Sequence, residues 1–308
     1  MRGGGTKGAY ESGALKAIIN KFKPIEYQYD VVSGVSIGAV NSVMLAIHPK
    51  GKEREALGEL ENIWRTHQVQ DLYRNWPKYG ILGGFFNDAI FDSTPLKNFA
   101  NDTLHGRPFI RKFTYESVDL NTGRVVNFDE KTTSAQQIQS VLASASIPGF
   151  FSPQHLQNMV LADGGVFENL NLGPAIVKCR EQGAPDQKII VDILLCFDQP
   201  VKIQQWTYEE AKYKSVSELN MRKKEIKDAY YYLEDIERVL RGFPDINVRY
   251  ILEPSQKLPS KYIPIFSSLE DTIFQIELGE KDMEALIESG KKSNNKHIEK
   301  MLETRNYI

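Results

Sequence analysis

The feature that most constrains this chain is a short stretch in which a strand-forming segment runs directly into an apolar helix. Residues 30–34 read DVVSG, which has the β-branched character of a buried strand, and residues 37–47 read IGAVNSVMLAI, which is typical of a buried helix. Residues 34–38 between them form the pattern G-x-S-x-G, with Ser36 at its centre. This context predicts that Ser36 occupies a sharp, strained turn at the end of a sheet strand.

Strand-forming and helix-forming segments alternate over most of the chain. The alternation predicts an α/β fold with three layers, in which helices cover both faces of a mostly parallel central sheet. Further strands are predicted at residues 111–120, 124–128, 158–162, 188–197 and 246–254, and helices at 8–22, 51–67, from Thr94 onward, from Ser134 to about 145, at 172–182 and at 280–302.

Residues 206–241 differ from the rest because they are long, charged and rich in tyrosine. Apolar residues repeat here at spacings of three and four, which predicts an amphipathic helix. They are Ile226, Tyr230, Leu233, Ile236 and Leu240. We therefore expect a single α/β domain over residues 1–308, with a core of 1–200 and 243–308 and a helical insertion at about 201–242.

The composition excludes several classes of protein. With 308 residues, 41% of them hydrophobic and 25% charged, the chain is typical of a globular protein. A net charge of −2 gives no reason to expect a nucleic-acid partner. No apolar run reaches the roughly 20 residues of a membrane span, and no signal peptide is visible. Cys179 and Cys196 fit no zinc or redox pattern, so we expect reduced cysteines in the core of a cytoplasmic protein.

Five glycines among the first thirteen residues leave backbone N–H groups uncovered, so this loop can hold a negative charge. Gly3, Gly5 and Gly8 match the dinucleotide pattern G-x-G-x-x-G. The context argues against that interpretation, because Asp30 begins its strand instead of ending it. The pattern of a phosphate-binding P-loop does not match either. In that pattern the lysine follows the last glycine, whereas Lys7 precedes Gly8. The weaker alternatives are a nucleotide site and a purely structural turn, and the favoured one is a loop that binds an oxyanion.

A serine nucleophile at position 36 needs a base. His297, the only histidine late in the chain, lies in the polar stretch KKSNNKHIEK and is expected to be solvated. The base is therefore sought among the carboxylates. In NMVLADGGVFENL, a predicted strand runs directly into Asp163-Gly164-Gly165, so this acid can face an open cleft. Taken alone, an Asp-Gly pair is more simply a β-turn.

The order of these motifs resembles the patatin-like phospholipase family. The matching pieces are RGGGTKGAYESGAL for the glycine-rich loop, GVSIG for the nucleophile and DGG for the second catalytic residue. SASIPGFFSP (144–153) is similar to the stretch ahead of the aspartate, and LIESGKKS (286–293) gives weaker support. The similarity runs from Arg2 to about Leu172.

The resemblance implies a Ser–Asp dyad without histidine that hydrolyses lipid acyl esters. It places the nucleophile at Ser36 and the base at Asp163. It places the oxyanion hole at the backbone N–H groups of Gly3, Gly4, Gly5 and Thr6. Such a mechanism uses no metal and no organic cofactor, takes a lipid or phospholipid as substrate and allows peripheral contact with a membrane.

Two further features bear on function. Residues 80–91, GILGGFFNDAIF, are either a mobile lipid-facing loop hinged at Gly83-Gly84 or part of the core. Members of the family carry a hydrophobic strand before the glycine-rich loop, whereas only Met1 and Arg2 precede Gly3 here. A catalytically impaired binding or scaffold protein is therefore the alternative to an active hydrolase.

Overall fold

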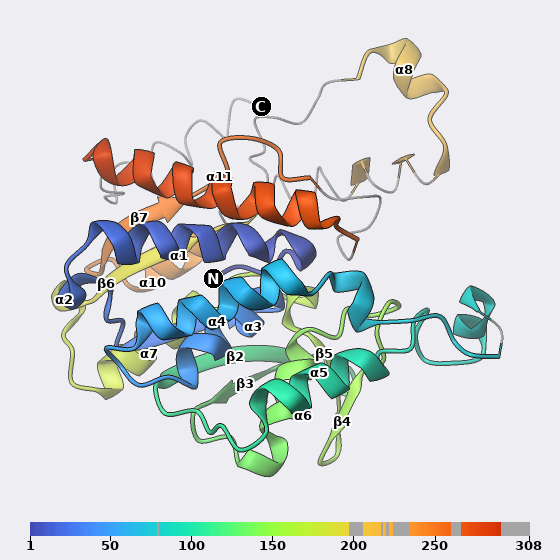
Figure 1. The fold of residues 1–308 in the computed structure, drawn as a ribbon, viewed down its shortest axis with the longest axis horizontal. Helices are drawn as coiled ribbons and strands as arrows, with labels where there is room; N and C mark the ends of the chain where they lie inside the picture. Colours follow the sequence, from blue (N-terminus) through green and yellow to red (C-terminus); the bar gives the residue numbers. More distant parts are fainter. Residues whose placement is uncertain are drawn as a thin grey trace.

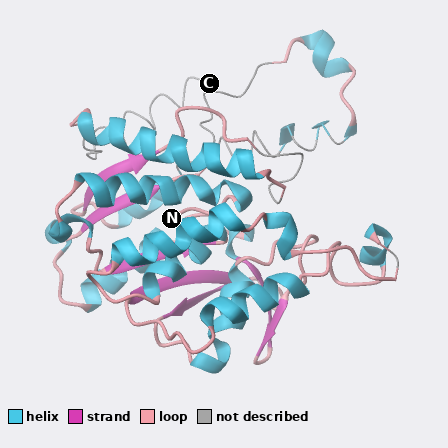
Figure 2. Cartoon of the chain, viewed as in Figure 1, coloured by secondary structure: helices cyan, strands magenta, loops and turns pink. Residues whose placement is uncertain are grey.

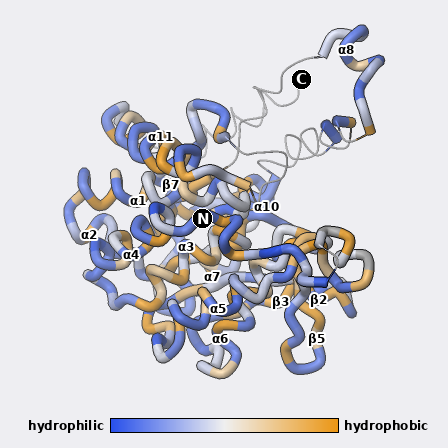
Figure 3. Tube along the Cα trace, turned by 45° about the vertical axis from the view of Figure 1, so that its right-hand side comes forward, coloured by the Kyte–Doolittle hydropathy of each residue, from blue (hydrophilic) through white to orange (hydrophobic). Residues whose placement is uncertain are grey.

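The computed structural model describes residues 1–78, 80–196, 206–216, 218, 219, 222, 223, 234–259 and 266–290. The described part has the predicted three-layer α/β arrangement, with strands between layers of helices (Figures 1 and 2). Apolar segments gather toward the interior, and the outer segments are mostly polar (Figure 3).

The strands form two groups. The larger sheet has the order β1-β2-β5-β4, with β3 paired to β2, and the smaller contains β6 and β7. The β1/β2 and β6/β7 pairs are parallel, whereas β3, β4 and β5 join by antiparallel pairing. The bounds are β1 (Val31–Val35), β2 (Lys112–Asp119), β3 (Arg124–Asp129), β4 (Gln154–Leu156), β5 (Met159–Asp163), β6 (Ile190–Leu194) and β7 (Asn247–Leu252).

The helices α1 and α11 run side by side and cover one face of the β6/β7 pair (Figure 1). Helices α7 and α10 bury their apolar residues against the other face. The bounds are α1 (Ala9–Lys21), α2 (Pro24–Tyr27), α3 (Ile37–Ala46), α4 (Glu53–Thr66), α5 (Thr94–Leu104), α6 (Ser134–Ser144), α7 (Leu172–Glu181), α8 (Tyr208–Lys212), α10 (Glu234–Gly242) and α11 (Leu269–Glu288).

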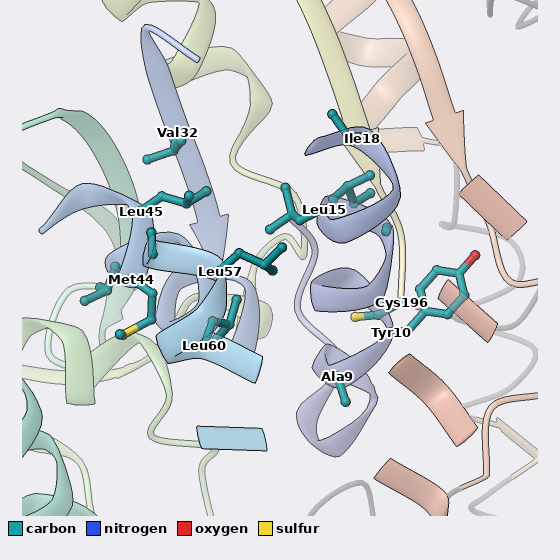
Figure 4. Close-up of a cluster of buried hydrophobic side chains, with 14 of the residues drawn as sticks. Ala9, Tyr10, Leu15, Ile18, Val32, Met44, Leu45, Leu57, Leu60 and Cys196 are labelled. Carbon is teal, nitrogen blue, oxygen red and sulfur yellow. The ribbon is translucent and has the colours of Figure 1, made fainter. Parts of the chain in front are cut away.

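The main core lies where α1, α3 and α4 meet the sheet. Helix α4 buries Ala56, Leu57, Leu60 and Trp64, whose spacing of three and four places them on one face. Leu15 of α1 points toward Leu57, whereas Tyr10 points away toward α11 (Figure 4). The Tyr10 hydroxyl donates a hydrogen bond to Asp282 of α11 at 3.0 Å.

The two strand groups are not paired with each other. A cavity separates β1 from β6, and residues of both strands, of α7 and Met1 line it. The first two residues bridge its end, because the Met1 amino group donates to the Ser33 carbonyl at 2.9 Å and Arg2 N donates to the Leu194 carbonyl at 3.2 Å. Residues 1 and 2 therefore connect β1 with β6 through backbone hydrogen bonds.

Several predicted elements need correction. The predicted helix over 206–241 is interrupted, because α8 ends at Lys212 and residues 213–215 are not helical, whereas 216, 218, 219, 222, 223 and 234–242 are helical. Ile236 of α10 is buried as predicted, whereas Ile226, Tyr230 and Leu233 lie outside the described residues. The last helix begins at Leu269 instead of at 280, because Ser268 and Asp271 form a capping box there.

Residues 80–91 divide between core and surface. Phe91 and Ile90 pack in an aromatic cluster with Tyr73 and Phe151, whereas the Phe86 side chain is 75% exposed. Gly83 and Gly84 are closely packed, since a Cβ on Gly83 would lie 2.4 Å from the Trp76 side chain. Close packing, and not a hinge, is therefore the reason that the structure gives for these glycines.

Candidate active site

Ser36 lies at the turn between β1 and α3, as the sequence predicts. Its backbone has φ 54° and ψ −126°, a strained conformation for a residue with a side chain. The flanking glycines allow this turn. A Cβ on Gly34 would lie 2.1 Å from the Gly38 carbonyl oxygen, and one on Gly38 would lie 2.5 Å from the Met1 carbonyl oxygen. The pattern G-x-S-x-G thus follows from the close approach of three backbone segments.

The structure brings Ser36 and Asp163 together. The Ser36 hydroxyl donates a hydrogen bond to Asp163 Oδ2 at 2.6 Å, and both side chains are buried. Asp163 is the last residue of β5, and its other carboxylate oxygen accepts from the Gly165 N–H at 2.7 Å. A Cβ on Gly164 would lie 2.8 Å from both the Glu116 carbonyl oxygen and Cγ, so glycine follows the aspartate for steric reasons.

Burial changes the acidity of this aspartate. Removal from water raises the pKa of Asp163 from 3.8 to about 7, and the hydrogen bonds from Ser36 and Gly165 oppose the rise only in part. A carboxylate with a pKa near 7 is a stronger base than an exposed aspartate and is still ionised at mildly alkaline pH. The Asp163 carboxylate can therefore take the proton of the Ser36 hydroxyl.

The glycine-rich loop lies against the serine. A Cβ on Gly3 would be 3.1 Å from both the Ser36 Cβ and the Asn169 side chain. The Gly3 N–H already donates to the Asn169 carbonyl at 3.0 Å. A 3₁₀ helix, Gly5–Gly8, begins two residues later and leads into α1, so its first N–H groups have no acceptor within the helix. Among the described residues, no backbone acceptor is found for the other three expected amides, those of Gly4, Gly5 and Thr6.

Sequence reasoning missed several residues that hold these groups in place. Ser144 accepts a hydrogen bond from Ser36 N at 3.2 Å and donates to the Glu116 carbonyl at 2.6 Å, which links the serine turn to β2. Asn169 connects the glycine-rich loop to the segment after Asp163. Ser144 does fall in the stretch SASIPGFFSP, but nothing in that stretch shows which of its serines faces the turn.

Among the described residues, no histidine ring is hydrogen-bonded to Ser36 or Asp163. The two ring nitrogens of His48 contact the Met44 carbonyl at 2.7 Å and Glu59 at 3.2 Å. His297 lies outside the described residues. Within the described ranges, no cluster of three or more His, Cys, Asp or Glu side chains could hold a metal ion. Cys179 and Cys196 are not in a disulfide, and Cys196 is fully buried.

An apolar cavity of about 140 Å³ opens beside Ser36. Gly5, Thr6 and Ser36 line it, together with side chains of α3, α4, α5 and α6. Val40, Met44, Leu60, Phe99 and Leu142 are among them. A carbonyl group held at Ser36 could therefore carry a hydrocarbon chain in this cavity.

The fold and the site together define a class: an α/β protein in which a serine at a strand–helix turn is hydrogen-bonded to a buried aspartate at the end of another strand. The chain belongs to the patatin-like phospholipase family, whose model matches residues 1–176, more than half of its length. None of the helices in the described ranges has the length and apolar character needed to cross a membrane.

The curated relatives include lysophospholipases of fungi. The one from Aspergillus terreus is 27% identical over 177 residues, which are 56% of this chain and 10% of that protein. The one from Pyricularia oryzae is 28% identical over 200 residues, 61% of this chain and 12% of that protein. The chain thus matches about a tenth of these relatives. The crystal structure of VipD from Legionella pneumophila is 12% identical with a TM-score of 0.40, covering 93% of this chain and 66% of VipD.

Proposed function

We propose that this protein is a serine acyl hydrolase that cleaves lipid acyl esters, as a phospholipase A or lipid acylesterase, through a Ser36–Asp163 dyad. The observation that carries the proposal is the 2.6 Å hydrogen bond from the Ser36 hydroxyl to the buried Asp163 carboxylate. The apolar cavity beside Ser36 and the membership of the patatin-like phospholipase family support a lipid as the substrate.

The reaction has two steps. Ser36 Oγ attacks the ester carbonyl carbon and its proton passes to Asp163, while the carbonyl oxygen becomes an oxyanion that accepts from the N–H groups of Gly4, Gly5 and Thr6. The bond to the leaving oxygen then breaks, and Asp163 returns the proton to that oxygen. Water next attacks the carbonyl carbon of the acyl-enzyme and gives a proton to Asp163. The bond to Ser36 Oγ then breaks, Asp163 returns this proton to Ser36 Oγ, and the fatty acid is released.

One oxyanion-hole donor and one general base typically have effects of similar size on the rate of acyl transfer. Removing a single oxyanion-hole donor typically costs about 10²–10³ in rate. General-base catalysis contributes roughly 10²–10⁴. The raised pKa of Asp163 places its ionisation near neutral pH, where the balance between base strength and ionised fraction is favourable.

The substrate we favour is a lipid with a single acyl chain, because the related fungal proteins are named lysophospholipases and the cavity beside Ser36 is apolar. A peripheral contact with the lipid surface is part of this proposal. The exposed Leu82 and Phe86 of the 80–91 loop are the side chains that could make it.

Labelling with a fluorophosphonate probe tests the proposal, because only an activated serine reacts. We expect the full chain to be labelled and Ser36→Ala to be unlabelled with unchanged thermal stability. Ser42→Ala is the matched control, since Ser42 lies on the same helix α3 and its buried hydroxyl has no hydrogen-bond partner among the described residues. If Ser36→Ala were still labelled, Ser36 would not be the nucleophile. If the wild type were not labelled, the proposed nucleophile would also be refuted, and a binding or scaffold protein would be favoured.

Turnover then identifies the substrate. We expect lysophosphatidylcholine to be hydrolysed faster than a diacyl phosphatidylcholine or a triglyceride presented in mixed micelles. Phe86→Ser should slow hydrolysis on vesicles but leave cleavage of a soluble nitrophenyl ester unchanged. Equal loss on both substrates would exclude a surface role for Phe86.

A further inference from the structure

A buried carboxylate lies beneath the glycine-rich loop and takes no part in the mechanism above. Glu11, in the first turn of α1, is fully buried. Its Oε1 accepts a hydrogen bond from Arg2 N, immediately before Gly3, at 2.7 Å, and this N–H is shared with the Leu194 carbonyl at the longer distance of 3.2 Å. Its Oε2 accepts from the Asn41 side-chain amide at 2.9 Å. One carboxylate thus connects the start of the loop with α3, the helix that begins at Ser36.

The partner of Glu11 is itself held in one orientation. The Asn41 amide nitrogen also donates to the Gly8 carbonyl at 2.9 Å, and its Oδ1 accepts from the Trp64 indole N–H at 3.1 Å. Asn41 cannot rotate its amide group without losing both of these bonds. It therefore presents an N–H, and not an oxygen, to Glu11.

We infer that Glu11 is a positioning residue, which in its ionised form holds the glycine-rich loop in register with the nucleophile helix so that the amides of Gly4, Gly5 and Thr6 point at the oxyanion. This inference rests on the proposed function. It assigns to Glu11 a role in the rate of the chemical step without contact with substrate.

The ionised form of Glu11 can accept a hydrogen bond from each of its two neighbours. Arg2 N and Asn41 Nδ2 both donate, and a carboxylate only accepts, whereas a protonated acid must turn a hydrogen toward one of the two donors. The titratable groups that face Glu11 are the Met1 amino group, the Arg2 guanidinium and the Cys196 thiol. Burial raises the pKa of Glu11 to about 7, and Met1, Asn41 and Arg2 hold it from rising further.

Glu11→Gln is the informative variant, because it keeps the size of the side chain and removes the charge. One end of the glutamine amide accepts and the other donates, so either Arg2 N or Asn41 Nδ2 then faces a second donor. We expect kcat on a soluble nitrophenyl ester at pH 8 to fall about tenfold, with KM changed less than twofold, since the loop stabilises the transition state more than the bound ester.

The pH profile separates positioning from packing. If both Asp163 and Glu11 must be ionised, the acid limb of log kcat/KM against pH has a slope approaching two in the wild type. In Glu11→Gln the slope is expected to be one. A loss of packing alone would lower the rate and leave the slope unchanged.

Glu53→Gln is the matched control. Glu53 is equally buried and pairs with Arg111 at 2.7 Å, away from the loop, so this variant should lose stability but keep its kcat. Equal kcat losses in the two variants, or a kcat for Glu11→Gln within twofold of wild type, would overturn the inference.

Hydrogen–deuterium exchange gives a test that does not depend on activity. In Glu11→Gln, exchange should rise in a peptide covering residues 2–8 and stay unchanged in β2 and β5. Unchanged exchange over residues 2–8 would refute the role of Glu11 even if the wild type proved inactive. A wild type that is not labelled, with faster loop exchange in Glu11→Gln, would refute only the proposed hydrolase.

Discussion

Burial makes the Asp163 carboxylate a usable base. The same burial lowers the stability of the folded protein when this carboxylate is ionised. Its pKa in the folded protein, about 7, is higher than the 3.8 expected when it is exposed. Between these values the folded state binds more protons than the unfolded state, so its contribution to stability falls as the pH rises. Over the whole range between the two pKa values, this loss of folding stability is on the order of 4 kcal/mol.

Asp163→Asn should therefore separate function from stability. We expect turnover to fall at least 100-fold, because amide nitrogen cannot accept the serine proton. We expect the melting temperature of the variant to drop less than that of the wild type between pH 5 and pH 8. Calorimetry at both pH values, together with ester hydrolysis, measures this. An equal drop in both proteins would mean that Asp163 is not protonated in the fold at pH 5.

Single residues also show how far the sequence alone could lead. Ser36 and Asp163 are found because each lies in a contiguous motif at the end of a strand. Gly3 was expected to serve the oxyanion hole, but its N–H is engaged by the Asn169 carbonyl, a backbone partner that no side-chain pattern reveals. Glu11 was missed for the same reason, since it bonds to a main-chain N–H and to Asn41, which is 30 positions away.

At the scale of elements, the contact between α1 and α11 depends on two glycines. A Cβ on Gly13 would lie 1.9 Å from the Ile276 carbonyl oxygen, and one on Gly279 would lie 2.0 Å from the Tyr10 carbonyl oxygen. The two helix backbones therefore approach more closely than side chains would allow. Helix α1 directly follows the glycine-rich loop, so this contact also fixes the helix that carries the loop.

Gly279→Ala should lower the free energy of unfolding by roughly 1–3 kcal/mol, because the added methyl group forces the two helices apart. Gly58→Ala is its counterpart on α4, where nothing lies within 4 Å of the new methyl group, and it should raise stability by about 0.5–1 kcal/mol. Urea denaturation measures both. A stabilising Gly279→Ala would show that α1 and α11 can move apart at no cost.

Most elements follow from local patterns, and the errors have physical causes. The strands and helices around Ser36 and Asp163 were predicted to within a few residues because their apolar spacing is regular. The early start of α11 at Leu269 was missed because the signal is a capping box, Ser268 with Asp271, and not an apolar repeat. The break after Lys212 lies in a charged segment, where helical spacing persists on both sides and does not show that the helix ends.

Of the four hydrophobic clusters among the described residues, the two largest share the β6/β7 pair. The larger one contains α1, α3, α4 and the inner face of the strands, and the smaller one contains α7, α10 and the outer face of β6 and β7. Because β1 and β6 do not pair, the backbone hydrogen bonds that link the two strand groups within the described ranges are those of Met1 and Arg2. We expect the smaller core to open independently of the larger one.

Ile236→Ala tests this expectation. Ile236 is fully buried on α10, and its truncation should cost the smaller core about 2–5 kcal/mol. Hydrogen–deuterium exchange should then accelerate in β6, β7 and α7 and remain slow in β1 and β2. Ile18→Ala, in the larger core, should accelerate exchange in both. Uniform acceleration in Ile236→Ala would show that the molecule opens as one unit.

The position of the first residues between the two halves links occupancy of the site to cohesion of the protein. An acyl group or phosphonyl group trapped on Ser36 would draw the amides of the neighbouring loop onto its oxygen, and the ordered loop would in turn hold β6 beside β1. Whatever binding free energy the loop gains at the site is therefore also gained at the join between the sheets. We therefore expect a group held covalently at Ser36 to strengthen the association of β6 with β1.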